Sequence, residues 1–159
     1  MDSKYIKDYR YNGARSLVML HEQHLRSFMQ TWNDAKRINI SLPKTEDPDY
    51  QSLETLLRHV IRAARGYMTW MCEKLNLLDP EIMQVPELDS IESEVNEYLI
   101  HLLVKWRTPL SDIVEDNFHS PTFISRWGVE YCVDAMLEHA VVHPIRHEFQ
   151  LKNLIANHK

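Results

Sequence analysis

Glycine is scarce in this chain of 159 residues, which contains only three. Sandwiches and barrels built from many hairpins place glycine at their turns, so this scarcity argues against an all-β fold. Two cysteines are too few for a disulfide framework, and we therefore expect a reducing, cytoplasmic environment. No apolar run approaches the ~20 residues of a membrane span, and the polar start lacks the apolar stretch of a signal peptide. The sequence thus predicts a protein with no membrane partner.

The balance of charge is weakly acidic. The formal net charge of -5 argues against nucleic acid as the main partner, because such partners select basic surfaces. Hydrophobic residues make up 44% and charged residues 26%, which is close to the average of soluble globular proteins. A chain of this length buries a core without staples, and we expect a single domain over residues 1–159.

Four stretches show the apolar spacing of three and four residues that is typical of amphipathic helices. They cover residues 8–34, 52–76, 91–113 and 129–156. Ser52 is a candidate N-cap, and Asp89 with Glu92 resembles a capping box. Pro109 is expected to kink the third stretch or to start a new segment, and residues 121–125 could hold a short extended piece. Four such helices bury their stripes best together, so the predicted fold is an all-α four-helix bundle with long connections.

Histidine is unusually frequent, with nine in the chain. His139, His143 and His147 are spaced four apart, which places them on one face of the last helix. By chance such a triple is expected only about 0.02 times in a chain of this composition. His143 and His147 share the apolar stripe, so they point into the bundle. They could be two neutral core histidines, but burying two imidazoles without partners is costly, and we favour metal ligands.

A third ligand should come from another helix, and His59 on the second helix is the candidate. Its neighbours Ala63 and Gly66 are small and leave room for a pocket, although an interfacial histidine beside the stripe is an equal alternative. Ferritin-like di-iron sites need Glu-x-x-His, which does not occur here. Zinc-protease helices need Glu directly after the first histidine, where this chain has Pro144. These comparisons leave a mononuclear three-histidine site.

Residues 137–151 resemble the last-helix motif of the DinB/YfiT-like superfamily, in which a second histidine follows the first after three residues. The matching positions are His143, His147, Gln150 and Leu151 on the last helix and His59 on the second, with His139 fitting a frequent extra histidine. The resemblance implies a four-helix bundle with a divalent metal on His59, His143 and His147, and a homodimer. Glu148-Phe149 replaces Arg-Gly, and Pro144 should disturb the helix.

The resemblance also implies a class of chemistry, because relatives include a transferase group that uses low-molecular-weight thiols. Three neutral imidazoles leave a bound ion its full charge and an open position for water, a thiol or a substrate. Zinc and nickel are the first candidates for the ion, followed by iron and manganese. Our first hypothesis is therefore metal-assisted transfer of a low-molecular-weight thiol onto a small-molecule electrophile.

Two other hypotheses stay open. Metal-assisted hydrolysis would use His139, Glu138 or Glu148 as base, although both glutamates are more typical of solvated helix-face charges. A metal-binding bundle involved in stress response, without turnover, is the third. His139, Gln150 and His21 are candidates for a shell around the ligands, with a hydrogen-bonded core histidine as the alternative for His21. Both cysteines, Cys72 and Cys132, are expected to pack within helices rather than to react.

Overall fold

The computed structural model describes residue 6 and residues 8–158, and this part of the chain is mostly helical. That agrees with the all-α expectation, apart from one small hairpin. The elements are α1 (Asn12–Arg37), the short 3-10 helix η2 (Pro48–Tyr50), α2 (Leu53–Lys74), α3 (Ile91–Trp106), α4 (Glu115–His119), β1 (Phe123–Ile124), β2 (Glu130–Tyr131) and α5 (Val133–Ala156). None of the helices in the described ranges is long and apolar enough to cross a membrane.

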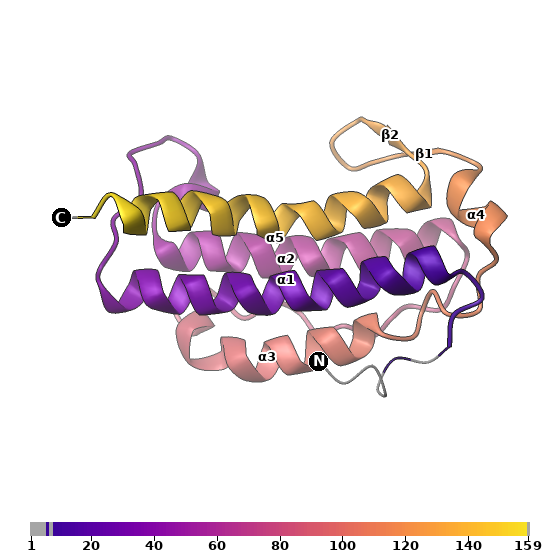
Figure 1. The fold of residues 1–159 in the computed structure, drawn as a ribbon, viewed down its shortest axis with the longest axis horizontal. Helices are drawn as coiled ribbons and strands as arrows, with labels where there is room; N and C mark the ends of the chain where they lie inside the picture. The colour runs from indigo at the N-terminus through magenta and orange to yellow at the C-terminus, as the bar shows by residue number, and fades with distance from the viewer. Residues whose placement is uncertain (1–5, 7, 159) are drawn as a thin grey trace.

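The four long helices lie side by side along the long axis of the molecule, and two run in each direction (Figure 1). Lys36, at the end of α1, forms ion pairs with Glu54 at the start of α2 and with Glu92 at the start of α3. The end of α1 therefore meets the beginnings of both α2 and α3. These two helices run in the same direction, so the connection of residues 75–90 has to return along the length of the molecule (Figure 1).

Local signals explain where α2 begins. The Ser52 side chain accepts a hydrogen bond from the N–H of Thr55, and the Thr55 hydroxyl accepts one from the N–H of Ser52. This reciprocal capping box satisfies two amide donors that a helix start leaves free. The similar prediction at Asp89 is wrong, because α3 starts at Ile91 with Ser90 as an N-cap that makes no side-chain capping bond.

Three helix boundaries differ clearly from the sequence prediction, and the first is the start of α1, which lies at Asn12 rather than near residue 8. Helix α3 ends at Trp106, so Leu110 continues the apolar stripe from a turn rather than from a helix. Helix α5 begins at Val133, because Glu130–Tyr131 pair with the predicted extended piece as strand β2. The helix runs unbroken through Pro144, so the proline does not end it.

The buried apolar side chains form one cluster shared by the long helices. Two indole groups tie these helices to the backbone of α2. Trp32 on α1 donates to the carbonyl of Leu53 at 2.6 Å, and Trp106 on α3 donates to that of Ala64 at 3.1 Å. Each bond satisfies a buried indole N–H while the ring fills the core. Helix α2 thus has its place fixed by neighbours on both sides.

Two buried carboxylates tie α1 to other elements. Glu22 accepts hydrogen bonds from Arg107, just after α3, at 2.9 and 3.1 Å, and from Arg26 on its own helix. Glu148 on α5 accepts from the hydroxyls of Ser27 at 2.7 Å and Thr31 at 3.3 Å, both on α1. The expectation that Glu148 is a solvated surface charge is therefore wrong: its exposed fraction is 6%.

His21 on α1 is buried, and its ring stacks on Trp106 with centroids 3.7 Å apart and planes 13° apart. Neither ring nitrogen has a hydrogen-bond partner in the described structure, which contradicts the expected hydrogen-bonded histidine. Burial lowers the pKa of His21 from 6.5 to about 3. The side chain is therefore neutral in the folded protein at physiological pH.

His21 should make the protein acid-sensitive. Between pH 6.5 and about 3 the unfolded chain binds a proton at this position that the folded chain does not. The free energy of unfolding should therefore fall with falling pH in this window, by about 1.4 kcal/mol per pH unit from this group. His21→Phe keeps a ring on Trp106 and should remove this part of the slope. Urea denaturation of both proteins from pH 7 to 4 measures the difference, and parallel curves would contradict the account.

Candidate metal centre

The three predicted ligands come together between α2 and α5. His143 and His147 lie one turn apart on the inward face of α5, with exposed fractions of 6% and 1%. His59 reaches them from α2, and its side chain keeps 20% exposure. The helix spacing of four residues thus places two rings on one face, and the packing of α2 against α5 supplies the third.

The geometry of the cluster suits a single ion. One nitrogen from each ring can be chosen so that all three lie within 4.8 Å of one another. The Nε2 atoms of His59 and His143 are 3.0 Å apart. The ring of His147 stands at 87° to that of His59 and at 73° to that of His143. Two nitrogens bound tetrahedrally to one zinc ion at about 2.0–2.1 Å lie roughly 3.4 Å apart, so this separation fits a shared metal.

The Nδ1 atoms of His59 and His147 each lie beside a hydrogen-bond acceptor. The Nδ1 of His59 lies 3.0 Å from a carboxylate oxygen of Asp49, and the Nδ1 of His147 lies 3.0 Å from the amide oxygen of Gln150. Since both partners accept, each Nδ1 donates its proton, and in a neutral ring the Nε2 then carries the lone pair that can bind an ion. Metal-binding histidines commonly have an acceptor at the far nitrogen, which fixes the ring and its tautomer.

Burial keeps the α5 rings neutral. Desolvation lowers the pKa of His143 to about 2, and the neighbouring histidines add to this effect. Desolvation also lowers the pKa of His147 to about 4, although its bond to Gln150 opposes the shift. Both rings are therefore available as neutral nitrogen donors at physiological pH, which is the form that binds a metal ion.

Sequence reasoning missed Asp49 and Tyr50, both in the short helix η2. Asp47 caps this helix by accepting the N–H of Asp49 at 2.9 Å. The Asp49 carboxylate also pairs with Arg62 on α2 at 2.9 Å, while the Tyr50 hydroxyl lies 3.5 Å from the Nε2 of His147. The signal that could have found this turn is Asp47-Pro48-Asp49, an N-cap followed by proline at the first helical position.

The other predicted shell residues have different positions. Gln150 contacts the site as expected. His139 lies beside the ligands, with its centroid 6.5 Å from that of His143, and stacks on Trp127. His21 packs on Trp106, and no hydrogen bond or ring contact of the described structure joins it to the three ligands.

Neither cysteine belongs to the cluster. Cys72 is buried in α2, and burial raises the pKa of its thiol to about 11. Cys132 is the N-cap of α5, and its sulfur accepts the N–H of Ala135 at 3.4 Å. Cys132 thus lies at the start of α5 as its N-cap rather than within the helix.

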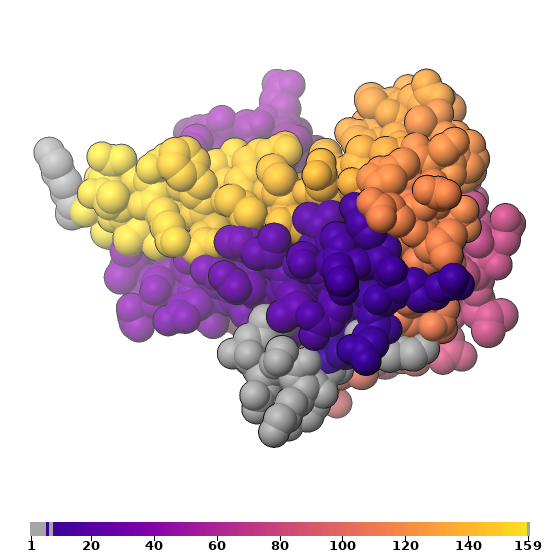
Figure 2. Space-filling view, turned by 45° about the vertical axis from the view of Figure 1, so that its right-hand side comes forward, coloured from indigo at the N-terminus to yellow at the C-terminus, as the bar shows by residue number. Residues whose placement is uncertain are grey.

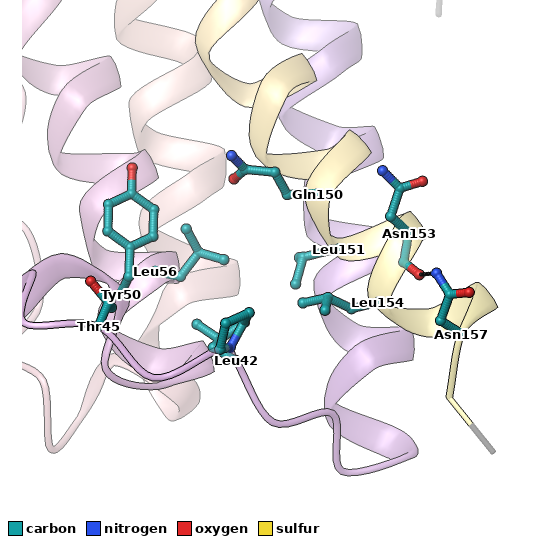
Figure 3. Close-up of a pocket in the computed structure, with 10 residues that line it drawn as sticks. Leu42, Thr45, Tyr50, Leu56, Gln150, Leu151, Asn153, Leu154 and Asn157 are labelled. Carbon is teal, nitrogen blue, oxygen red and sulfur yellow. Dashed lines mark hydrogen bonds between the residues drawn. The ribbon is translucent and has the colours of Figure 1, made fainter.

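Two cavities flank the cluster. One, of about 430 Å³, is mostly apolar and includes Tyr50 and Gln150, which both contact His147. Figure 3 shows these two side chains on facing sides of its upper end, with Leu42 and Leu154 below them. The other, of about 370 Å³, is lined by the ligands His59 and His143 themselves. A small molecule in this second cavity would therefore touch two of the three ligands.

Comparison with known proteins adds no relative. No family model, no curated protein and no solved structure gives a significant match to this chain. The arrangement of residues is therefore the basis for any functional argument.

Asp49 should matter for metal affinity although it is not a ligand. Asp49→Asn removes the charge that orients His59 and strengthens its donation, so the affinity for Zn²⁺ should fall roughly 10–100-fold. Competition with a chromophoric chelator measures the affinity. Glu94→Gln, an equivalent change at an exposed position of α3, should have no effect. Equal affinities of Asp49→Asn and the unsubstituted protein would show that Asp49 plays no such role.

Proposed function

We propose that the chain is a metal-dependent enzyme whose divalent ion is held by His59, His143 and His147. The observation that carries this proposal is the convergence of three imidazole nitrogens within 4.8 Å at a buried interface. The donor set fits a metal because two Nδ1 atoms already donate to Asp49 and Gln150, which directs the remaining lone pairs to one point. Three uncharged nitrogen ligands favour zinc or nickel, ahead of iron and manganese.

We also propose that the four long helices form a four-helix bundle of the DinB/YfiT-like kind. Support comes from the parallel pairs α1 with α5 and α2 with α3 (Figure 1), and from the position of the histidines on α2 and α5. A homodimer and a cytoplasmic location belong to the same proposal. The two free cysteines are compatible with a reducing compartment.

The reaction that we propose is transfer of a low-molecular-weight thiol to an electrophilic small molecule. A divalent ion on three neutral imidazoles would supply Lewis acidity and favour the deprotonated form of a thiol. In the transfer, the thiol sulfur forms a bond to the electrophilic carbon, the leaving group departs with its electron pair, and the thiol proton passes to solvent. The chain's own residues position the ligands and exclude water from the buried side of the cluster.

Hydrolysis is the second candidate. It needs a base, and His139, whose ring centroid is 6.5 Å from that of His143, is a predicted base that lies beside the candidate ligands. Glu148 is bound to Ser27 and Thr31 on the α1 side. Asp49 is engaged by His59 and Arg62. A thiolate is a strong nucleophile without such a base, so the carboxylates in the described part of the site suit thiol transfer better. A stress-related bundle without turnover remains the alternative if no thiol reacts.

Removing a ligand should remove the metal and the reaction together. We expect His143→Ala to lose most of the bound metal after dialysis, because two imidazoles hold a divalent ion far less tightly than three. Metal analysis and a conjugation assay with a chromogenic aryl halide and several thiols measure both effects. His59→Ala and His147→Ala should behave likewise.

The control is His24→Ala, which removes a histidine of α1 outside the cluster and should change neither readout. Stoichiometric metal in all three ligand variants would contradict the metal site. Absence of conjugation by the fully metal-loaded protein with every thiol tested would contradict thiol transfer alone.

The cysteines should be dispensable for the reaction. Cys72→Ala with Cys132→Ser removes both thiols but keeps an N-cap for α5, since serine is a favoured capping residue. The rate of conjugation should stay within about twofold of the original, because the Cys72 thiol is buried and protonated and the Cys132 sulfur caps a helix. A folded, metal-loaded double variant without activity would make one cysteine the nucleophile.

A further inference from the structure

The hairpin that precedes α5 carries an arginine side chain at the edge of the cavity of about 370 Å³. Arg126 lines this cavity together with the ligands His59 and His143. It makes no hydrogen bond or ion pair with any described residue, and no described acidic residue lines the cavity. A Cβ at Gly66 would lie 3.6 Å from an Nη atom of Arg126, so the guanidinium extends over the surface of α2.

The hairpin has internal bonds that fix its tip. The N–H of Ser125 donates to the carbonyl of Val129 at 2.8 Å, and the N–H of Val129 donates to the Ser125 hydroxyl at 3.0 Å. Gly128 has a φ of 83°, a left-handed conformation that glycine adopts without strain. Trp127 stacks on His139 of α5, with ring centroids 5.4 Å apart. Arg126 is therefore presented from an anchored turn.

Two segments project on the same side of α5 (Figure 1). One is the loop with η2, which carries Asp49 and Tyr50, and the other is the hairpin, which carries Arg126. In Figure 2 the hairpin stands out in light orange beside the yellow α5. The two walls of the site thus differ in chemistry, with a carboxylate and a phenol on one side and a free guanidinium on the other.

Two arginines lie at the cavity, and a protein carboxylate neutralises one of them. Arg62 also lines the cavity, but Asp49 neutralises it through two contacts of 2.9 and 3.0 Å. Glu73, whose pKa responds weakly to Arg126, is paired with Lys74 at 2.9 Å instead. The cavity therefore offers an anion one cation that no protein carboxylate occupies.

A second donor in the cavity wall also has no acceptor. Trp70 lines the cavity, is 4% exposed, and its indole N–H has no partner in the described structure. Buried indole N–H groups usually find an acceptor. The other lining groups, including Ala63, Tyr67 and Met136, present mostly carbon surface. The cavity combines unpaired donors with an apolar wall, which suits a ligand that has an oxyanion attached to an apolar body.

We infer that this cavity is the substrate pocket of the metal centre and that Arg126 binds an anionic oxygen group of the substrate, a carboxylate or a phosphonate-like group. The inference rests on the proposed function, because it places the substrate against His59 and His143. A guanidinium recognises either group through two parallel N–H bonds. The apolar body of the substrate then lies against Tyr67 and Trp127.

The test measures binding of small probes to the zinc-loaded full chain by calorimetry. Phenylacetate and benzylphosphonate are the two anionic probes, and phenylacetamide is the neutral probe of the same shape. At least one anion should bind about tenfold or more tightly than the amide, and the better of the two identifies the oxyanion. Arg126→Met should abolish this preference, and Arg126→Lys should retain part of it. Arg37→Met, at an exposed arginine of α1, should leave it unchanged.

Metal content is measured on the same samples, so a failure of the Arg126 assignment can be distinguished from a failure of the proposed metal site. Equal binding of acid and amide would overturn the assignment. An anion preference that survives Arg126→Met would also overturn it, since the anion would then be held by the metal alone. A chain that binds no metal but shows the Arg126-dependent preference would contradict the proposed function and leave an anion pocket.

Discussion

The convergence of three imidazole rings between α2 and α5 is the constraint on which the proposed site depends. The Nε2 atoms of His59 and His143 are 3.0 Å apart, a separation that is filled either by a hydrogen bond between the two rings or by an ion bound to both. An additional proton that would charge a ring is disfavoured, because burial lowers the pKa of His143 to about 2 and that of His147 to about 4. A divalent ion bound to all three rings would replace such a hydrogen bond and bring two positive charges into the cluster.

The surrounding structure holds this arrangement from outside. Asp49 and Gln150 accept the outer protons of His59 and His147, which decides the nitrogen that faces inward. Glu148 lies next to His147 in sequence but points to the other side of α5, where Ser27 and Thr31 of α1 bind it. His147 thus faces the histidine cluster, while the adjacent Glu148 takes part in the packing of α5 against α1. This division explains how a glutamate can be buried beside the histidine cluster without joining it.

Periodicity in the sequence predicted the helical parts and two of the candidate ligands, because these depend on spacing along one helix. His143 and His147 share a face by virtue of the four-residue repeat. His59, in contrast, was predicted from its place beside the apolar stripe of α2 and from its small neighbours Ala63 and Gly66. What the sequence could not give depends on contacts between distant segments. Asp49 and Tyr50 lie in a stretch whose prolines indicate only a loop, and their approach to α2 and α5 follows from the path of that loop.

The wrong predictions have the same origin. Glu148 resembles a surface residue until Ser27 and Thr31 are brought opposite it. The hairpin of residues 123–131 is too short to show a strand pattern, so its tip residue Arg126 could not be related to the cavity. Residue spacing along α5 predicted two candidate ligands, whereas the residues that would contact a substrate depend on tertiary packing.

Anomalous diffraction at the zinc absorption edge, on crystals of protein purified with added Zn²⁺, tests the central claim most directly. The account predicts one strong peak between α2 and α5, at about 2.0–2.1 Å from a nitrogen of each of His59, His143 and His147. A map without a peak at this position, with the three rings hydrogen-bonded to one another or to water, would contradict it.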